Sequence, residues 1–306
     1  MEYMTAMSDY LPAPATVSLA GHEVAPIAWG MWRFAGADVG TARARIDAAF
    51  EAGVTLFDTA DIYGCDTPGG FGSAEALLGE VFAEAPALRD KMLLATKGGI
   101  ILGVPYDSSA PYLASAIDIS LKRLRTDRVE LWQIHRPDLL THPQEAARAL
   151  EEAHRAGKIG AIGVSNFTPS QAAALAKFLP VPVVSHQSEF SPLHLNPLFD
   201  GIFDQSMAEG MTFLAWSPLG GGRLGDPADE RARAIAALLD AKAAEYDVSR
   251  AAATYSWVMA HPARPIPIVG TQNPGRIKEI PQAFAPRWTR AEWYAVLQTS
   301  MGENLP

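Results

Sequence analysis

Short runs of β-branched and apolar residues alternate with longer segments of helical periodicity along almost the whole chain, and this alternation restricts the possible folds. Strands and helices that alternate in this way form parallel sheets, because each helix crosses back over the sheet before the next strand begins. Eight strands are predicted, at residues 24–29, 54–58, 91–97, 129–135, 159–164, 183–187, 212–216 and 265–269.

The helices predicted between these strands are rich in alanine, leucine, glutamate and arginine, which are good helix formers. Gly53, Gly157 and Gly210 each follow a helical segment directly, where a left-handed backbone ends a helix. Thr168 and Pro169 form a helix start, with a capping hydroxyl before a proline of the first turn. The predicted helices span residues 39–52, 74–85, 112–125, 143–156, 169–177, 198–209, 228–246 and 274–280.

The chain has 306 residues, which suits either two ordinary domains or one large barrel. Eight strand–helix units of about 38 residues each would fill it, as in a typical barrel. A doubly wound sheet is the alternative, but it usually carries G-x-G-x-x-G after its first strand, and here that strand is followed by Gly30, Met31, Trp32 and Arg33. No linker or internal repeat divides the sequence. We therefore predict a single (β/α)8 TIM barrel over residues 1–306, with a short N-terminal extension and a C-terminal tail.

Composition and charge exclude several functions. With 48% hydrophobic residues the chain can build a large core, and its net charge of −9 argues against binding to nucleic acid. One cysteine, Cys65, excludes an intramolecular disulfide, and the histidines lack the paired spacing of a zinc site, so we predict no metal. No signal peptide or long apolar run is present, so we expect a soluble cytoplasmic protein with no membrane partner.

Chemically active side chains stand where neighbouring strands end, and the loops that follow the strands form the active face of a barrel. Asp58 ends the second predicted strand, Lys97 the third and His135 the fourth. They are separated by about one repeat length each, so we expect them at the same level of adjacent strands. Tyr63 follows Asp58 closely enough to fold back over them.

These four residue types together favour proton donation to a substrate. The pKa of a free tyrosine is about 10, and a neighbouring ammonium group lowers it by stabilising the phenolate, so we expect Lys97 to lower the pKa of Tyr63. Asp58 would keep Lys97 charged and in place. A ring N–H of His135 would orient a carbonyl oxygen toward the tyrosine. Asp58 and Lys97 taken alone fit a structural ion pair equally well, but the four together favour catalysis.

Four motifs in order along the chain resemble those of the aldo-keto reductase family. They are GVTLFDTADIYG at 53–64, ATKG at 95–98, QIHRPD at 133–138 and GAIGVSNF at 160–167, and the resemblance covers most of the chain. The segments IHRPD and SPLGGGRLG at 217–225 are most similar to those of bacterial oxidoreductases of the family. The resemblance implies that a small aldehyde or ketone is reduced to an alcohol, with hydride from NADPH, or alternatively NADH, and the proton from Tyr63.

The resemblance also implies that the cofactor lies across the barrel mouth without a Rossmann motif. Ser165, Asn166 and Gln187 would bind its carboxamide and Trp216 would stack on the nicotinamide ring, while Trp32 would form a wall of the substrate pocket. The glycine-rich loop after Trp216 would approach the pyrophosphate closely. Arg276 would be the main cation for a 2'-phosphate, which favours NADPH. The other cofactor contacts implied are Gly30, Met31, Ser217, Pro218, Leu219, Gly220, Gly222, Arg223, Gly270, Thr271, Asn273 and Glu279.

Two alternative functions use the same residues. Some members of the family bind NADPH as redox-sensing regulatory subunits, and the intact set of four residues argues against that role here. Barrels also host Schiff-base lyases, in which Lys97 would act as a nucleophile. The sequence assigns no element to the tail after residue 286, no role to Cys65 and no oligomeric state.

Overall fold

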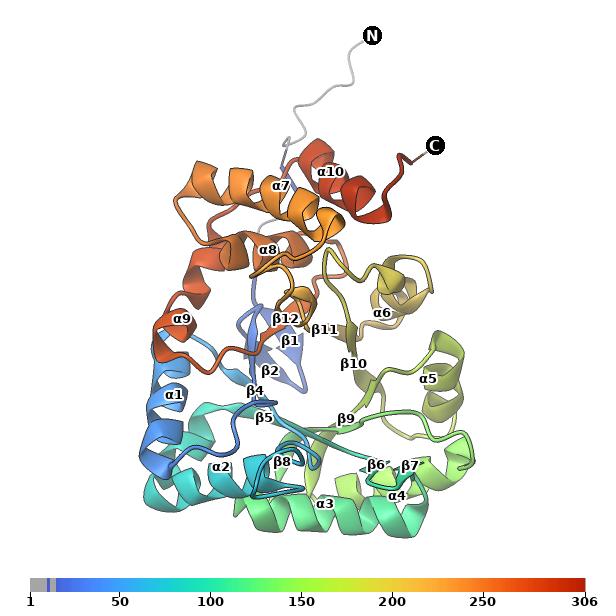
Figure 1. Cartoon of the computed structure of the whole chain (residues 1–306). Helices are drawn as coiled ribbons and strands as arrows, with labels where there is room; N and C mark the ends of the chain where they lie inside the picture. The colour runs from blue at the N-terminus through green and yellow to red at the C-terminus, as the bar shows by residue number, and fades with distance from the viewer. Residues whose placement is uncertain (1–9, 12–14, 306) are drawn as a thin grey trace.

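Eight parallel strands close into a barrel in a computed structural model that describes residues 10–11 and 15–305 (Figure 1). The strands follow one another around the barrel in chain order, which confirms the predicted (β/α)8 fold. Most of the predicted N-terminal extension, residues 1–9 and 12–14, lies outside the described residues. The barrel strands are β3 (Ala28–Gly30), β4 (Leu56–Asp58), β5 (Leu93–Gly98), β8 (Val129–Ile134), β9 (Ile159–Ser165), β10 (Val183–Glu189), β11 (Thr212–Trp216) and β12 (Ile266–Val269).

The first strand differs from its prediction. The expected strand at 24–29 combines the end of a hairpin, β1 (Val17–Leu19) and β2 (His22–Val24), with the barrel strand β3. Pro26 stands between the two, where it cannot donate a ladder hydrogen bond. The buried Leu19 and Val24 of the hairpin pack with residues near the beginnings of the barrel strands, such as Leu56. The hairpin therefore covers the amino end of the barrel, opposite the face where chemistry is expected.

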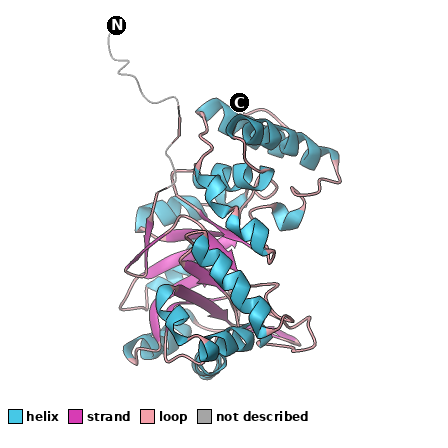
Figure 2. Cartoon of the chain, turned by 90° about the vertical axis from the view of Figure 1, so that its left-hand side faces the viewer, coloured by secondary structure: helices cyan, strands magenta, loops and turns pink. Residues whose placement is uncertain are grey.

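Helices surround the strands, as Figure 2 shows. Gly53, Gly157 and Gly210 all have the predicted left-handed backbone, with φ of 76°, 73° and 69°. Thr168 accepts from the backbone of Gln171, whose side chain accepts in return from the backbone of Thr168, which confirms the predicted start of this helix. The helices next to the strands are α1 (Val39–Glu51), α2 (Ser73–Glu84), α3 (Ala110–Leu124), α4 (Pro143–Arg155), α5 (Pro169–Ala176), α6 (Ile202–Glu209), α8 (Arg250–Met259) and α9 (Pro274–Lys278). Short 3-10 helices occur at η1 (Pro86–Lys91), η2 (Asn196–Leu198), η3 (Gly220–Gly222) and η4 (Ile280–Phe284).

Three helices stack at one side of the barrel, at the top of Figure 1: α7 (Glu230–Tyr246), α8 and α10 (Arg290–Met301). α7 packs on α8 and α10, while α8 lies against β12. Trp257 of α8 stacks on Trp293 of α10 at 4.8 Å between ring centroids. The start of α10 is a capping box of Thr289 and Glu292, a pattern that was readable in the tail.

None of the helices within residues 10–11 and 15–305 is long and apolar enough to cross a membrane.

Candidate active site

A fully buried ion pair lies at the carboxyl end of the barrel. The Lys97 Nζ donates to both carboxylate oxygens of Asp58, at 2.8 and 2.7 Å, and to the carbonyl oxygen of Thr59 at 2.8 Å. Burial acts to lower the pKa of Lys97, but the charges of Asp58 and Tyr63 and the hydrogen bonds to both outweigh it together, and the pKa is raised. Lys97 is therefore held as an ammonium ion with all three protons donated. This disfavours a Schiff-base nucleophile, which needs a free amine.

The pair does not lie at one level of the sheet. Asp58 is paired with Ala95 across the strands, so Lys97 stands two residues further along β5. Side chains two residues apart on a strand point to the same side, and Lys97 therefore faces inward like Ala95 and reaches back to Asp58. Neighbouring strands of a barrel are staggered. The expectation that Asp58 and Lys97 stand at the same level of their strands is therefore wrong, although the two side chains do contact each other.

Tyr63 covers the ion pair from the loop after β4. The Lys97 Nζ lies 4.9 Å from the centroid of the Tyr63 ring. The edge of the Tyr63 ring meets Trp32 at 5.0 Å and His135 at 5.9 Å between centroids. The three predicted residues Asp58, Lys97 and His135 are thus brought together around Tyr63, which is only 8% exposed.

The expected lowering of the Tyr63 pKa is wrong. Burial raises the pKa of Tyr63, and the charge of Lys97 opposes that rise without overcoming it. The physical reason is that the Lys97 ammonium is largely neutralised by Asp58, whose own charge raises the pKa further. The Tyr63 phenol consequently carries its proton at neutral pH, which is the form that a proton donor requires.

His135 is neutral. Its burial, followed by the positive charges of Lys97 and Arg136, lowers its pKa well below the ordinary value of 6.5. A neutral imidazole carries a single ring N–H. The buried Nδ1 has no hydrogen-bond partner within the described residues, while the ring as a whole lines the cavity beside Tyr63. Neutral His135 is suited to donate one hydrogen bond and unsuited to act as an acid.

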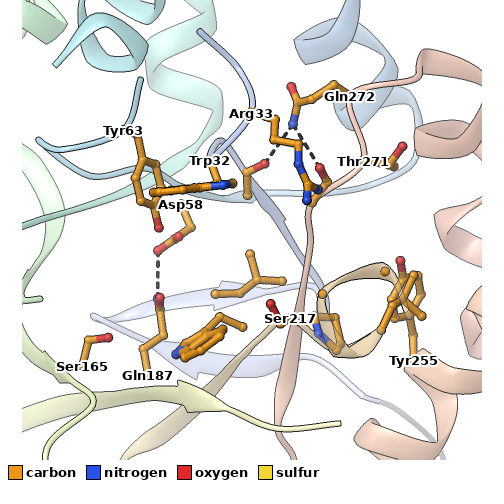
Figure 3. A pocket seen from close by; sticks show the side chains of 18 of the residues that line it. Trp32, Arg33, Asp58, Tyr63, Ser165, Gln187, Ser217, Tyr255, Thr271 and Gln272 are labelled. Carbon is orange, nitrogen blue, oxygen red and sulfur yellow. Dashed lines mark hydrogen bonds between the residues drawn. The ribbon is translucent and has the colours of Figure 1, made fainter. Parts of the chain in front are cut away.

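A cavity of about 740 Å³ opens in front of these residues (Figure 3). It extends from Tyr63 and Trp32 to the segment after β12, and strand ends and following loops supply most of its wall. The predicted residues that line it are Gly30, Trp32, Asp58, Tyr63, His135, Ser165, Asn166, Gln187, Trp216, Ser217, Pro218, Leu219, Gly222, Gly270, Thr271, Asn273 and Arg276.

Four predicted cofactor residues do not line this cavity. Met31 is fully buried in the core, and Gly220 packs beneath its loop against Leu193. The Arg223 Nε donates to the carbonyl oxygen of Gly220 at 2.9 Å, and Glu279 caps the end of α9.

Five lining residues were not predicted, namely Arg33, Arg136, Tyr255, Ile268 and Gln272, while Gly221 belongs to the glycine-rich loop expected to approach the pyrophosphate. Arg33 and Arg136 directly follow Trp32 and His135, so their position next to predicted residues was a readable signal. Tyr255 lies on α8, which is not among the helices predicted from the sequence, and no such signal marks it.

Side-chain amides connect the cofactor side of the cavity to the ion pair. The Gln187 Nε2 donates to Asp58 Oδ1 at 2.9 Å. The Asn166 Nδ2 donates to the Ser165 Oγ at 2.8 Å and to the carbonyl oxygen of His135 at 3.1 Å, while Asn166 Oδ1 accepts from Trp216 Nε1. The backbone N–H of Asn166 donates to the carbonyl oxygen of Gln187 at 2.8 Å, and this bond joins the two sets into one network that links the Trp216 ring to Asp58.

The cavity carries uncompensated positive charge. Arg33, Arg136 and Arg276 line it, and none of them forms an ion pair within the described residues. Asp58 is the one acidic residue among the described lining, and it is already paired with Lys97. In a chain with a net charge of −9, three free arginines around one cavity indicate an anionic ligand.

The described part of the chain holds no cluster of His, Cys, Asp and Glu suited to a metal ion, and metal independence stays a prediction.

The chain is a (β/α)8 barrel protein with a large cavity at the carboxyl ends of its strands. It belongs to the aldo/keto reductase family, whose model matches residues 26–298. The chain is 53% identical over 305 residues to a 6-dehydroglucose reductase of Novosphingobium aromaticivorans, covering 98% of this chain and 100% of that one. It is 34% identical to a 6-dehydroglucose reductase of Agrobacterium fabrum, over 92% of this chain and 96% of the relative. The same fold occurs in a glycerol dehydrogenase of Gluconobacter oxydans, with a TM-score of 0.81 at 24% identity over 98% of both chains.

Proposed function

We propose that this aldo/keto reductase reduces an aldehyde or ketone to an alcohol with NADPH, and that Tyr63 supplies the proton. The observation that carries the proposal is the buried, protonated Tyr63 on the wall of the large cavity, above the Lys97 ammonium and beside neutral His135. A proton donor, a charge that stabilises the resulting phenolate and a hydrogen-bond donor for the carbonyl oxygen thus meet at one point.

Each of the four residues has a separate role in the proposed reduction. A bound nicotinamide cofactor supplies the hydride for the carbonyl carbon. The ring N–H of His135 donates to the carbonyl oxygen, and the Tyr63 hydroxyl transfers its proton to that oxygen as negative charge develops. Lys97 then stabilises the Tyr63 phenolate electrostatically, while Asp58 and the Thr59 carbonyl hold the ammonium in position. One hydride and one proton convert the carbonyl to the alcohol.

The cavity residues fit a phosphorylated dinucleotide. Trp216 offers an aromatic face for the nicotinamide, and the backbone N–H of Gly221, which has a φ of 71°, has no acceptor within the described residues and is open to a pyrophosphate. Arg33 supplies a free cation on the wall of the cavity, whereas the predicted Arg223 donates to the carbonyl oxygen of Gly220. Arg276 lines the end of the cavity that is formed by the segment after β12, and a 2'-phosphate would lie beside it.

Replacing Arg276 by glutamine is expected to weaken NADPH binding about 10- to 100-fold and to leave NADH binding unchanged, because a charged hydrogen bond contributes about 1.5–3 kcal/mol and NADH lacks the 2'-phosphate. Titration of protein fluorescence with each nucleotide measures both affinities, since Trp216 would report a stacked ring. Lys278→Gln is the matched control, because Lys278 lies on the same helix but pairs with Glu51 on the outside. Equal losses for NADPH and NADH in Arg276→Gln would contradict the assignment of the 2'-phosphate to this residue.

Replacing Tyr255 by phenylalanine is expected to lower the affinity for NADPH about 3- to 10-fold, as loss of one hydrogen bond does. Tyr255 is 6% exposed, lines the cavity and has no hydrogen-bond partner within the described residues, so its hydroxyl is free for a phosphate or ribose oxygen. Burial raises its pKa, and the charge of Arg276 opposes the rise, so the hydroxyl stays protonated and donates. Tyr112→Phe serves as the control, because that tyrosine lies outside the large cavity. Unchanged affinity in Tyr255→Phe would remove this residue from the cofactor site.

For the substrate, we propose a sugar-derived aldehyde. Two relatives are named 6-dehydroglucose reductases, and the substrate end of the cavity combines the 47% exposed ring of Trp32 with the free guanidinium of Arg136. Aromatic faces pack on sugar rings and arginine donates to hydroxyl oxygens. A panel that includes 6-dehydroglucose, glyceraldehyde and 4-nitrobenzaldehyde, assayed with NADPH and with NADH, tests both class and reaction. Tight NADPH binding without turnover of any carbonyl would instead support a regulatory subunit.

A further inference from the structure

A second cavity of about 320 Å³ lies between α3 and the hairpin of β6 (Ile100–Ile101) and β7 (Val104–Tyr106). It shares no lining residue with the large cavity. The segment after β4 separates the two, since Asp58 and Tyr63 line the large cavity and Asp61 lines the second. The remaining wall is mostly apolar and consists of Phe71, Ile101, Leu102, Tyr112, Ala116 and Ile119, with Ser115 and Arg123 as polar members.

Asp61 is the unusual residue of this wall. It is 2% exposed, and its Oδ1 has no hydrogen-bond partner within the described residues. Its backbone N–H donates to the carbonyl oxygen of Lys97 at 2.9 Å, which fixes the carboxyl group behind the ion pair without contacting it. The backbone N–H of Ile62 donates to the carboxyl group, which leaves Oδ1 as its unpartnered oxygen. A buried oxygen without a partner is costly, by about 1–3 kcal/mol, and needs an explanation such as a ligand that contacts it.

The charges around Asp61 do not balance. From α2 it faces Glu75, which is fully buried and accepts from Thr96 Oγ1 at 2.6 Å. From α3 it faces Arg123, whose Nη1 lies 3.4 Å from Glu75 Oε2, and Tyr112, whose pKa is raised to about 12 by burial and then by Asp61. On the other side, Lys97 is saturated by its contacts with Asp58 and Thr59, and Tyr63 is neutral. Two buried carboxyl groups therefore share a single guanidinium group.

This imbalance decides the protonation of Asp61. Burial, followed by the charge of Glu75, raises the pKa of Asp61 well above its usual range and so favours its protonated form in the free protein. One additional positive charge in the cavity would balance both carboxylates.

We propose that the second cavity binds a primary alkyl- or arylammonium ion, with the ammonium group on the Asp61 carboxylate and the apolar body against Phe71, Ile101 and Ile119. An ammonium group supplies the missing charge and three donors for the orphaned oxygen. A cavity of this volume holds a small organic molecule. On binding, Asp61 gives up its proton to the solvent while the ligand keeps its charge, so one proton is released per ligand bound.

Calorimetric titration of the full-length protein with benzylamine tests the site, with benzyl alcohol as the uncharged ligand of matched shape. At pH 7 we expect benzylamine to bind at least about 10-fold more tightly, since one charged hydrogen bond contributes that much. Titrations in two buffers of different ionisation enthalpy are expected to show proton release with benzylamine and none with benzyl alcohol. Saturating NADPH is expected to leave the binding of benzylamine unchanged, because the two cavities are separate.

Two variants and one control complete the test. Asp61→Asn, which keeps the shape of the protonated acid, is expected to abolish the preference for the amine and the proton release. Ser115→Tyr fills the cavity from an exposed position of α3 and is expected to weaken both ligands. Asp66→Asn removes an exposed charge from the same loop and is expected to change nothing. Equal affinities for amine and alcohol, amine binding that survives in Asp61→Asn, or displacement of benzylamine by NADPH would each overturn the proposal.

Discussion

Tyr63→Phe is expected to lower kcat for aldehyde reduction by about 10²- to 10⁴-fold, the range by which a positioned general acid accelerates a reaction. The substitution removes one hydroxyl group and keeps the ring that packs edge-on against Trp32 and near His135. The affinity for NADPH is therefore expected to stay the same. Steady-state kinetics with an aromatic aldehyde, combined with fluorescence titration of the cofactor, separates the loss of the proton from any loss of binding.

The pH dependence adds a second signature. Since burial raises the pKa of Tyr63 above its ordinary value, the acid form persists through neutral pH and is lost only as the pH rises through that raised value. The wild-type rate is thus expected to fall on the alkaline side, and this limb is expected to be absent in Tyr63→Phe. Tyr106→Phe, on an exposed hairpin, is the control and should keep the wild-type rate. Near-normal turnover by Tyr63→Phe would remove it as the proton donor.

The sequence was sufficient for the barrel because its main signals are local. Strand and helix periodicity, with glycines such as Gly53 and Gly157 at helix ends, depends on residues close together in the chain, and the structure has all eight strands. The end of the hairpin is joined to β3 in the prediction because residues 24–29 form one short apolar run, in which only Pro26 marks the boundary. The helix α8 is not predicted because the helical segment at 228–246 is long enough for the crossover from β11 to β12.

Those properties of the site that depend on how charges are arranged in space could not be predicted from the sequence. Spacing along the chain brings Asp58, Lys97 and His135 to one end of the barrel, but barrel stagger sets their actual level. The sign of the Tyr63 shift depends on how completely Asp58 neutralises Lys97, and that needs two distances rather than a motif. Likewise, the free state of Arg33 and Arg136 is known only once every nearby carboxylate has been placed.

Lys97→Met is expected to destabilise the protein by about 3–5 kcal/mol, in addition to abolishing turnover, because it leaves the Asp58 carboxylate buried with no opposing charge. Among the described residues, Gln187 would then be the remaining side-chain donor to Asp58. The charge of Lys97 is available to Asp58 throughout the neutral range, since the pKa of Lys97 is raised and its proton is lost only at alkaline pH. Urea denaturation of both proteins measures the difference in free energy of unfolding.

The loss in Lys97→Met is expected to come from the unpaired Asp58 carboxylate. Adding Asp58→Asn removes the orphaned charge, so the double variant is expected to regain part of the stability while remaining inactive. If the single variant were as stable as the double one at pH 8, Asp58 would not carry an uncompensated charge, and the ion pair would serve orientation alone.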